Sequence, residues 1–498
     1  MSKRIGLISL YNKYQPGLRY LKELLQSRGI EAPILFFKHD YGYSLGEKFN
    51  YPTEIEKQLF IEFCSECDAV GFSVFSGFFP IVKELITLLK ERLPRKPIII
   101  GGIHATLAPQ QCADVADYVV LGDGEVSLKK IEMVVKGKRP EQTPNFWTGK
   151  DGTVLGLKIY PDLDELPFPD WTDRGNWFIE DNKLFQENHT KHVVEYMCAT
   201  ARGCPFSCSY CANSAFVKLY KGKSNLRQRS VDNVMAELIR AKKIHPNLGV
   251  IDFCDDVFTM DSDWVKGFAE KYKQYINLPF FCLVQPNMTK TEDIAVLKNA
   301  GLRAVTIGIQ SGSKKILYDV YKRYTSPDKI ISAINTINNL GVHVVADLIV
   351  DNPYDTEETM QETFDLLMHL NKPFHLNMPS LTHLPYTELT ERALKEGVIK
   401  ETMVEGNSTK SVENWFDYQD SKSSKMHTFW NSLFRMAGYK GISNTWLIKL
   451  SRDKHYREHP VELRTLSFRL TKFWNSRIFK MHRFSSIHIQ HLKVRLGL

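Results

Sequence analysis

The sequence predicts an α/β protein with two β/α domains in series and a mainly helical region after them. Three observations predict this class. Short apolar segments alternate with amphipathic ones over residues 1–140, and the same alternation returns over residues 193–397. The last hundred residues lose the alternation and mix aromatic with basic side chains. We therefore divide the chain into residues 1–140, 141–190, 191–400 and 401–498.

The first segment is predicted to be a doubly wound domain of the Rossmann or flavodoxin kind. Its strands are continuous apolar runs, which are typical of a parallel sheet covered on both faces. The ligand crevice of such a sheet lies at the carboxyl ends of the strands. We predict strands at 4–10, 34–37, 69–75, 97–101 and 116–121, and helices at 17–28, 52–67 and 80–93.

Residues 141–190 are rich in Pro, Gly and Asp, which predicts a linker that wraps a surface. Six β/α units follow and predict a partial (β/α)6 barrel of the TIM type, with its chemistry at the carboxyl ends of the strands. The strands are predicted at 193–199, 250–254, 280–284, 304–309, 343–350 and 374–380, and helices at 230–244 and 291–300.

Composition sets limits on the class of protein. A hydrophobic content of 43% over 498 residues is enough to form cores, which excludes global disorder. The first apolar run is too short for a secretion signal, and no run approaches the roughly 18 apolar residues of a membrane-spanning helix. We therefore expect a cytoplasmic protein. Nine cysteines in such a chain indicate metal or redox chemistry rather than disulfides.

The positive charge is concentrated in residues 401–498, where 17 Lys and Arg stand against 8 Asp and Glu. Two interpretations stay open. The segment could lie on an anionic membrane surface, or it could form a helical cap over the barrel mouth with a solvated basic face. A nucleic-acid partner is disfavoured because no RNA-binding module accompanies the basic residues. The aromatic residues concerned are Trp415, Phe416, Phe429, Trp430, Phe434, Trp446, Phe473 and Trp474.

The most specific motif is the cysteine triad Cys204, Cys208 and Cys211, with the spacing Cys-x3-Cys-x2-Cys. A structural zinc site normally takes four ligands, which three thiolates cannot supply. Three thiolates can hold three irons of a 4Fe–4S cluster and leave the fourth iron open to a small molecule. Tyr210, just before the third cysteine, is suited to shield the cluster from solvent.

This triad, placed after the first barrel strand, resembles the signature of the radical S-adenosylmethionine superfamily. The resemblance implies a 4Fe–4S cluster whose open iron chelates S-adenosylmethionine. One electron, from a donor such as flavodoxin or ferredoxin, then cleaves the sulfonium to a 5′-deoxyadenosyl radical that takes a substrate hydrogen. In such enzymes the protein supplies orientation and excludes water.

Several strand ends in the barrel resemble positions where this family holds S-adenosylmethionine. Asp255 and Asp256 end the second strand and are predicted to bind the methionine amino group, because a carboxylate is the natural partner of an ammonium. Gln310 stands where the family usually has an acid, so a ribose contact is predicted without the charge. Ser311 and Arg323 resemble contacts to the methionine carboxylate.

The N-terminal domain resembles the cobalamin-binding domain that precedes the barrel in one branch of the superfamily. The resemblance rests on glycine-containing motifs at strand ends, since glycine lets backbone approach a ligand closely. The cobalamin contacts predicted from it are Asn12, Tyr14, Gly17, Ser73, Gly101, Gly102, His104, Gly122, Gly124 and Glu125.

One departure concerns the cobalt ligand. Domains that ligate cobalt carry a histidine where this chain has Tyr14, and a neutral phenol is a poor cobalt ligand. We therefore predict that cobalamin binds without a protein histidine on its lower face. His104, in Gly-Gly-x-His-x-Thr, is predicted to order its loop rather than to bind cobalt.

These features predict a cobalamin-dependent radical methyltransferase that acts on an unactivated carbon. A first alternative is radical cyclisation or rearrangement without methyl transfer; S-adenosylhomocysteine is produced only by methylation and separates the two. A second alternative, of another class, is a non-catalytic cobalamin or cluster sensor. A membrane-proximal tail would suit a lipid-like or tetrapyrrole-like substrate, and the sequence identifies the substrate no further than a small molecule.

Overall fold

The structure is a computed structural model that describes residues 2–38, 50–149, 156–187, 193–221, 226–408 and 424–481, with side chains described up to residue 471. Contacts within the chain divide it into two compact units. The first unit comprises Met1–Lys191, Gly203–Arg229 and Thr382–Asp417; the second comprises His192–Arg202, Ser230–Leu381 and Tyr418–Leu498. The segment with the cysteine triad is thus part of the same unit as the N-terminal domain.

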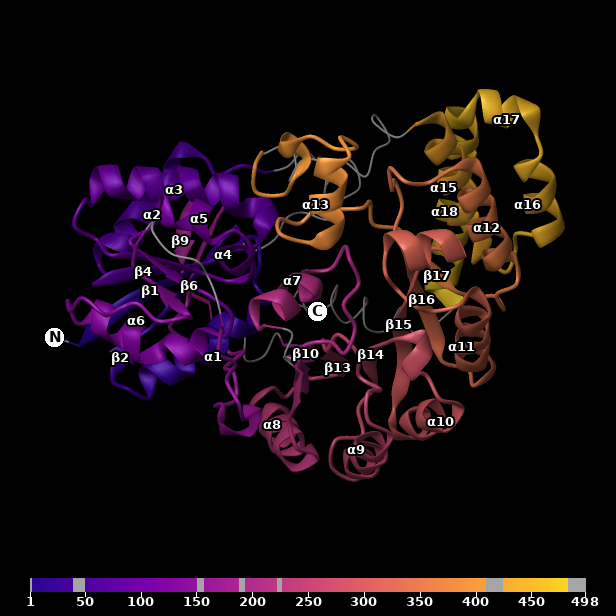
Figure 1. The fold of residues 1–498 in the computed structure, drawn as a ribbon. Helices are drawn as coiled ribbons and strands as arrows, with labels where there is room; N and C mark the ends of the chain where they lie inside the picture. The colour runs from indigo at the N-terminus through magenta and orange to yellow at the C-terminus, as the bar shows by residue number, and fades with distance from the viewer. Residues whose placement is uncertain are drawn as a thin grey trace. The chain divides into compact units, whose positions relative to one another are not determined.

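A nine-stranded sheet forms the centre of the first unit, in the order β7-β6-β5-β4-β1-β3-β8-β9 with β2 beside β1. Figure 1 labels β1, β2, β4, β6 and β9 of this sheet. The strands from β6 to β8 in this order are parallel, and β7 and β9 pair antiparallel at the two ends. The five predicted strands correspond to β1, β3, β4, β5 and β6. The strands are β1 (Lys3–Leu10), β2 (Ile30–Glu31), β3 (Ile34–Phe37), β4 (Ala69–Ser73), β5 (Ile98–Gly101), β6 (Tyr118–Val120), β7 (Phe146–Trp147), β8 (Trp177–Glu180) and β9 (Lys183–Phe185).

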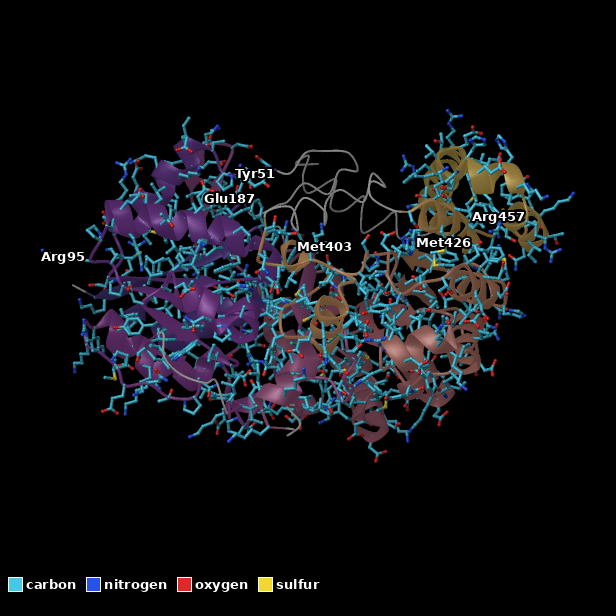
Figure 2. The ribbon with its side chains drawn as sticks, turned by 45° about the horizontal axis from the view of Figure 1, so that its top comes forward. Tyr51, Arg95, Glu187, Met403, Met426 and Arg457 are labelled. Carbon is cyan, nitrogen blue, oxygen red and sulfur yellow. The ribbon has the colours of Figure 1, made fainter. Side chains whose placement is uncertain are left out.

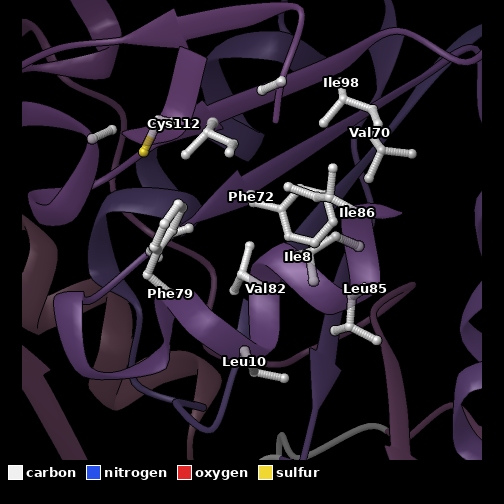
Figure 3. Packing of buried hydrophobic residues seen from close by; sticks show 14 of the residues in the cluster. Ile8, Leu10, Val70, Phe72, Phe79, Val82, Leu85, Ile86, Ile98 and Cys112 are labelled. Carbon is white, nitrogen blue, oxygen red and sulfur yellow. The ribbon is translucent and has the colours of Figure 1, made fainter. Parts of the chain in front are cut away.

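Helices cover both faces of this sheet, which confirms the doubly wound prediction. One hydrophobic cluster joins the sheet to α2, α3 and α5, and a second joins it to α1 and α6. Figure 3 shows part of the first cluster, including Ile8 of β1, Phe72 of β4 and Ile86 of α3. The helices of the unit are α1 (Pro16–Gln26), α2 (Glu54–Ser65), α3 (Phe79–Arg92), α4 (Ile103–Leu107), α5 (Pro109–Ala113), α6 (Leu128–Val135), α7 (Ala212–Leu219) and α13 (Glu388–Lys395).

The segment predicted as a wrapping linker is part of the first unit and contributes β7, β8 and β9 to its sheet. Its main anchor is Arg19 of α1, whose side chain is buried. The Arg19 guanidinium donates to the Asp170 carbonyl and to the Asp173 carboxylate, both at 2.7 Å, and stacks on Trp171 at 4.3 Å. A buried arginine is tolerated only when paired in this way.

The second unit contains an open six-stranded sheet that starts at β10 and ends at β17, with every neighbouring pair parallel. Helices follow the strands and lie along the sheet, as a partial barrel requires (Figure 1). The strands are β10 (Glu195–Cys198), β13 (Val250–Phe253), β14 (Phe280–Val284), β15 (Leu302–Gln310), β16 (His343–Leu348) and β17 (His375–Asn377). The helices are α8 (Val231–Ile244), α9 (Ser262–Tyr275), α10 (Thr291–Ala300), α11 (Pro327–Asn339) and α12 (Glu357–Met368).

The C-terminal region is helical, as predicted, with α15 (Lys425–Ala437), α16 (Asn444–Ser451), α17 (Lys454–Glu458) and α18 (Pro460–Met481). α15 packs on α12 and α18 and buries Phe429, Trp430 and Phe434 completely or nearly so. The Arg457 guanidinium of α17 lies over the rings of Phe429 and Trp430, at 4.7 and 5.3 Å from their centroids. Figure 2 labels Arg457 among the C-terminal helices. These three aromatic residues therefore form a core. Trp415 and Phe416, and the side chains of Phe473 and Trp474, lie outside the described part of the chain.

Among the described residues, no helix is both long enough and apolar enough to cross a membrane.

Candidate active site

The cysteine triad lies on a tight loop that leads into α7. Gly203, just before Cys204, has φ +88°, a conformation that favours glycine. Cys211 is the N-cap residue of α7, and its N–H donates to the Cys208 carbonyl at 3.0 Å. Cys208 is buried, while Cys204 and Cys211 are partly exposed. The loop therefore places one buried and two partly exposed cysteines at the start of one helix.

The donor set fits a 4Fe–4S cluster better than a single ion. In the part of the chain that the structure describes, no three His, Cys, Asp or Glu side chains are grouped around one position that could hold a metal ion. In a 4Fe–4S cluster each thiolate binds a different iron, so its ligands stand farther apart than those of a single ion. Three cysteines on one loop agree with this arrangement.

The back of the cysteine loop is held by the segment around α13, which the sequence analysis did not assign to the site. The Leu389 N–H donates to the Ser209 carbonyl at 3.0 Å, and Lys218 of α7 pairs with Glu391 of α13 at 3.2 Å. Tyr210, predicted to shield the cluster, is half-buried next to these contacts. Carbonyls that bond to backbone amides fix the loop, which positions its thiols.

α7 packs directly on the N-terminal domain. Ala212 and Ala215 contact Leu107 of α4, and Leu219 and Tyr220 join the hydrophobic cluster under α3. Alanine on the facing side of α7 allows this close approach. The helix that starts at a cysteine of the triad is therefore embedded in the domain predicted to bind cobalamin.

The predicted cobalamin contacts gather at the carboxyl ends of the parallel strands of the N-terminal sheet. Ser73 ends β4, Gly101 ends β5, and Gly122 follows β6 with φ +65°. Gly102 has φ +94°, and a Cβ there would lie 2.6 Å from the Val74 nitrogen. Gly124 begins a single 3-10 turn that also contains the buried Glu125, and a Cβ on Gly124 would meet nothing within 4 Å. Backbone is thus close-packed at Gly102 and open at Gly124.

The turn between β1 and α1 carries the remaining predicted contacts. The Asn12 carboxamide accepts from the Tyr14 N–H at 2.8 Å, Tyr14 is exposed, and a Cβ on Gly17 would meet nothing within 4 Å. Gln15, which the sequence analysis missed, is buried between this turn and β4. Its Nε2 has no hydrogen-bond partner among the described residues, while its Oε1 accepts from Ser73 at 3.5 Å. An unpaired buried donor beside open glycine backbone fits a polar ligand such as cobalamin at this edge.

His104 is placed to order its loop. Its ring is buried, its Nδ1 lies 3.1 Å from the Ser76 hydroxyl, and Phe79 covers it at 4.2 Å between ring centroids. Burial lowers the pKa of His104 to about 4, so the ring is neutral at physiological pH. Gly406 closes the other side, since a Cβ there would lie 2.6 Å from the imidazole. This packing agrees with the role that we predicted for His104.

Asp255, at the end of β13, has partners that the sequence analysis did not foresee. Its buried carboxylate accepts the N–H groups of Thr200 at 2.7 Å and Ala201 at 2.8 Å, and also the Thr200 hydroxyl. Burial raises its pKa to about 6, although these hydrogen bonds act in the opposite direction. Asp256, in contrast, is exposed. Asp255 thus anchors the chain just before the cysteine loop, and Asp256 is the more accessible of the two carboxylates.

This anchoring predicts how the free energy of unfolding responds to pH and to substitution. The folded pKa of Asp255 lies near 6, above its ordinary 3.8, so the folded protein holds a proton that the unfolded chain releases. The stability that comes from this extra proton is therefore complete below pH 3.8 and is lost as pH rises through about 6. The free energy of unfolding falls by about 3 kcal/mol over this range. Urea unfolding of Asp255→Asn across this window should show a shallower pH dependence than the parent.

Asp252 serves as an internal reference for the pH dependence, and Asp255→Ala is a second variant that tests the hydrogen bonds. Burial also raises the pKa of Asp252 to about 6, so its share of the pH dependence should remain in Asp255→Asn. Asp255→Ala leaves the two buried N–H groups without acceptors and should lower the free energy of unfolding by about 2–6 kcal/mol. Equal pH slopes in the parent and Asp255→Asn would contradict the anchoring role.

The end of β15 brings together three predicted contacts to S-adenosylmethionine. Gln310 has φ +67°, and the strand register shifts between Gly308 and Gln310. The Arg323 guanidinium donates to the Gly308 carbonyl at 2.8 Å, and a Cβ on Gly308 would meet both the Gln310 and the Arg323 side chains. The Ser311 hydroxyl, next along the chain, accepts from the Ser313 N–H at 3.1 Å. An irregular strand end thus collects an amide, a hydroxyl and a buried guanidinium.

α15 adds polar residues at the carboxyl end of β16 that the sequence analysis missed. Asn431 donates to the Asp351 carboxylate at 3.2 Å, and His427 Nε2 lies 3.8 Å from Asp355. Burial alone would lower the pKa of His427, but the carboxylates of Asp355 and Asp351 raise it above its ordinary value. α15 therefore holds the loop after β16, and both interpretations of the basic C-terminal region stay predictions.

Two family models match the chain. The B12 binding domain matches residues 5–132, and the radical SAM superfamily matches residues 199–367. The first match covers β1 to β6 and the second runs from the cysteine loop through most of the six-stranded sheet. The two matches fit a cobalamin, a 4Fe–4S cluster and S-adenosylmethionine as cofactors.

Curated relatives are distant. An uncharacterised methyltransferase of Pyrococcus horikoshii is 26% identical over 61% of this chain and 64% of its own length. The cytidylyl-2-hydroxyethylphosphonate methyltransferase of Streptomyces wedmorensis is 25% identical, covering 71% and 72%. The anaerobic magnesium-protoporphyrin IX monomethyl ester cyclase of Rubrivivax gelatinosus is 26% identical, covering 65% and 58%. The matched part is thus less than two thirds of the first and third relatives.

A solved structure has the same fold over nearly the whole chain. The radical S-adenosylmethionine methyltransferase TsrM from Kitasatospora setae, determined with cobalamin and a [4Fe-4S] cluster bound, superposes with a TM-score of 0.60 at 15% identity. The match covers 95% of this chain and all of that one. The domain order, the cysteine motif and the matched models lead to one conclusion: the chain belongs to the radical SAM superfamily, in the branch with a B12-binding domain ahead of the radical SAM domain.

Proposed function

We propose that this protein is a cobalamin-dependent radical methyltransferase that methylates an unactivated carbon of a small molecule. The observation that carries the proposal is the packing of α7 on the B12-binding domain. Because α7 starts at Cys211 and is embedded beside the carboxyl ends of β5 and β6, the residues for the cluster and for cobalamin belong to one compact unit. Radical generation and methyl donation then have a common rigid support.

When bound, the cluster with S-adenosylmethionine supplies a radical that removes a hydrogen atom, and cobalamin supplies the methyl group. The protein's own residues hold these groups in place. Cys204, Cys208 and Cys211 ligate the cluster, and the open backbone at Gly17 and Gly124 admits cobalamin. Ser311 and Arg323 hold the methionine carboxylate, and Gln310 the ribose. Asp256, the exposed carboxylate, pairs with the amino group while Asp255 fixes the approach to the cysteine loop.

Names of the relatives support a small-molecule substrate, since they include a nucleotide-linked phosphonate and a porphyrin ester. The cyclase among them keeps ring formation without methyl transfer as the alternative. The electron is proposed to come from a flavodoxin or ferredoxin type of donor, and the protein is proposed to work in the cytoplasm.

The decisive experiment is product analysis after anaerobic purification with cobalamin supplied and reduction by dithionite. Methyl transfer predicts both 5′-deoxyadenosine and S-adenosylhomocysteine, with methylation of the cobalamin visible in its absorption spectrum. 5′-Deoxyadenosine alone would support the cyclase type of reaction. Neither product, from protein that has bound both cofactors, would overturn the proposal in favour of a sensor.

Peripheral contact of residues 401–498 with an anionic membrane, which would favour a lipid-like or tetrapyrrole-like substrate, stays a prediction. Its support is the exposure of Trp446 and Ile448 beside Lys449 and Arg452 on and after α16. Sedimentation with anionic vesicles tests it. Replacing Lys449 and Arg452 by glutamate should weaken binding, and equal partition of the two forms would contradict the prediction.

A further inference from the structure

α7 connects two functional loops of the first unit. Its N-cap residue is Cys211, its C-cap residue is Tyr220, and its eight residues span about 12 Å at 1.5 Å per residue. The residues between these ends are packed rather than free, since Ala215 is fully buried and Leu219 lies in the core cluster of the B12-binding domain. A short helix fixed along its length transmits a displacement of one end to the other.

The far end of α7 contacts the loop after β6 that carries Gly122 and Gly124. Gly122 has φ +65°, and a Cβ built on it would lie 2.6 Å from the Tyr220 hydroxyl and 3.3 Å from the Asn145 amide. The Tyr220 hydroxyl therefore occupies the space that glycine leaves empty. Any residue other than glycine at position 122 would move Tyr220 or the loop.

A second contact lies one residue farther along the same loop. The Arg227 guanidinium, after α7 in the chain, forms an ion pair with Asp123, and both side chains are largely buried. Arg227 also donates to the Tyr160 carbonyl at 2.8 Å, and the Tyr160 N–H donates to Asp123 at 2.8 Å. A buried, multiply bonded ion pair holds one geometry because breaking either partner leaves a charge uncompensated. The segment after the triad is thus fastened to the β6 loop at two successive residues.

We propose that α7 couples the two cofactor sites, so that cobalamin at the β6 loop makes the cysteine loop hold its cluster more tightly, and the cluster makes cobalamin bind more tightly. The inference rests on the proposed function. Because α7 is fixed along its length, a group that sets the position of one end also sets the position of the other, so the second group meets a site that is already in place. Such coupling is reciprocal: each group changes the affinity for the other by the same factor, whereas the rate of iron loss need not change by that factor. Tyr220 and Gly122 are positioning residues in this scheme.

The test measures binding rather than turnover. The full chain is reconstituted anaerobically, and loss of iron to a chelator is followed with and without hydroxocobalamin. Cobalamin affinity is then titrated for the cluster-free and the cluster-loaded protein. We expect cobalamin to slow iron loss, and the cluster to tighten cobalamin, each by about 5-fold or more.

Variants at positions 122 and 220 test whether the contact between Gly122 and Tyr220 causes the coupling. Gly122→Ala, which overlaps the Tyr220 hydroxyl, should bring both ratios close to one, and Gly122→Ala with Tyr220→Phe should regain part of the coupling because the overlap is removed. Tyr220→Phe alone leaves the backbone unchanged and provides the test if Gly122→Ala does not fold. We expect both of its ratios to be smaller than those of the parent but greater than one. Gly149→Ala is the matched control, since Gly149 is exposed and a Cβ there would meet no atom of the described residues within 4 Å.

The possible failures are distinguishable. If the parent binds both groups and forms 5′-deoxyadenosine and S-adenosylhomocysteine, yet both ratios equal one, the coupling is wrong and the proposed function stands. Ratios in Tyr220→Phe and in Gly122→Ala that equal those of the parent would also overturn the role of this contact. If the parent forms neither product, the proposed function itself fails.

Discussion

Replacement of Cys208 by alanine should abolish the cluster and with it the formation of 5′-deoxyadenosine. Cys208 is the buried member of the triad, and its carbonyl also receives the Cys211 N–H at the start of α7. Two remaining thiolates would leave two irons without a protein ligand. Since loss of an outer-shell partner alone costs 10–100-fold in metal affinity, loss of a direct ligand should cost at least about 100-fold. Iron content and 5′-deoxyadenosine, both measured anaerobically, check this result.

Cys112→Ala is the matched control for this variant. Cys112 is also buried and also in the first unit, but it lies in the hydrophobic cluster under α3. Burial raises the pKa of the Cys112 thiol, so it stays protonated and is a poor metal ligand. Its replacement should leave iron content unchanged. Full iron content and product formation in Cys208→Ala would refute the assignment of the triad.

Replacement of Gly102 by alanine should have the largest effect on the B12-binding domain. The new methyl group would lie 2.6 Å from the Val74 nitrogen and 2.9 Å from the Val74 oxygen, and neither backbone atom can turn away as a side chain could. The backbone at φ +94° adds strain. Together we expect a loss of about 2–6 kcal/mol in the free energy of unfolding and weaker cobalamin retention.

Gly267→Ala provides the contrast for this second variant. Gly267 lies inside α9, and its Cβ would have only a 3.9 Å contact to Val231. Alanine there should raise the free energy of unfolding by about 0.4–1 kcal/mol, because it restricts the unfolded chain. Denaturant unfolding of both variants compares the two glycines. A loss below about 1 kcal/mol in Gly102→Ala would show that the β4 and β5 ends can separate.

Strand positions were predictable because each depends on a local run of apolar residues. β3 and β14 begin and end at the predicted residues, and the other predicted strands differ from the observed ones at their ends. The cysteine triad was predictable for the same reason, since its three members lie within eight residues. The short strands β7, β8 and β9 were missed because their segment is dominated by turn-forming residues. β7 pairs with β6, β8 pairs with β3 and β9 pairs with β8, and the first two pairings join residues far apart in the sequence.

Contacts between distant residues could not be predicted in this way. The role of Asp255 depends on the N–H groups of Thr200 and Ala201, which approach it only because β10 pairs with β13. Gly122 could be recognised from the sequence as a glycine at the end of a strand. The neighbouring sequence gave no indication that the Tyr220 hydroxyl occupies the space where a side chain at position 122 would lie. The cofactor contacts carried over by resemblance stay predictions until ligands are bound.

The attachment of α15 to the loop after β16 limits how the C-terminal region can be studied. Removing residues 424–481 would expose Phe364 of α12, whose ring lies 5.7 Å from that of Trp430, and would leave Asp351 without Asn431. A truncated chain would therefore be prone to aggregate, and its loss of vesicle binding or of turnover could not be attributed to surface charge. Point substitutions at exposed positions can separate vesicle binding by this region from its packing in the core, whereas truncation cannot.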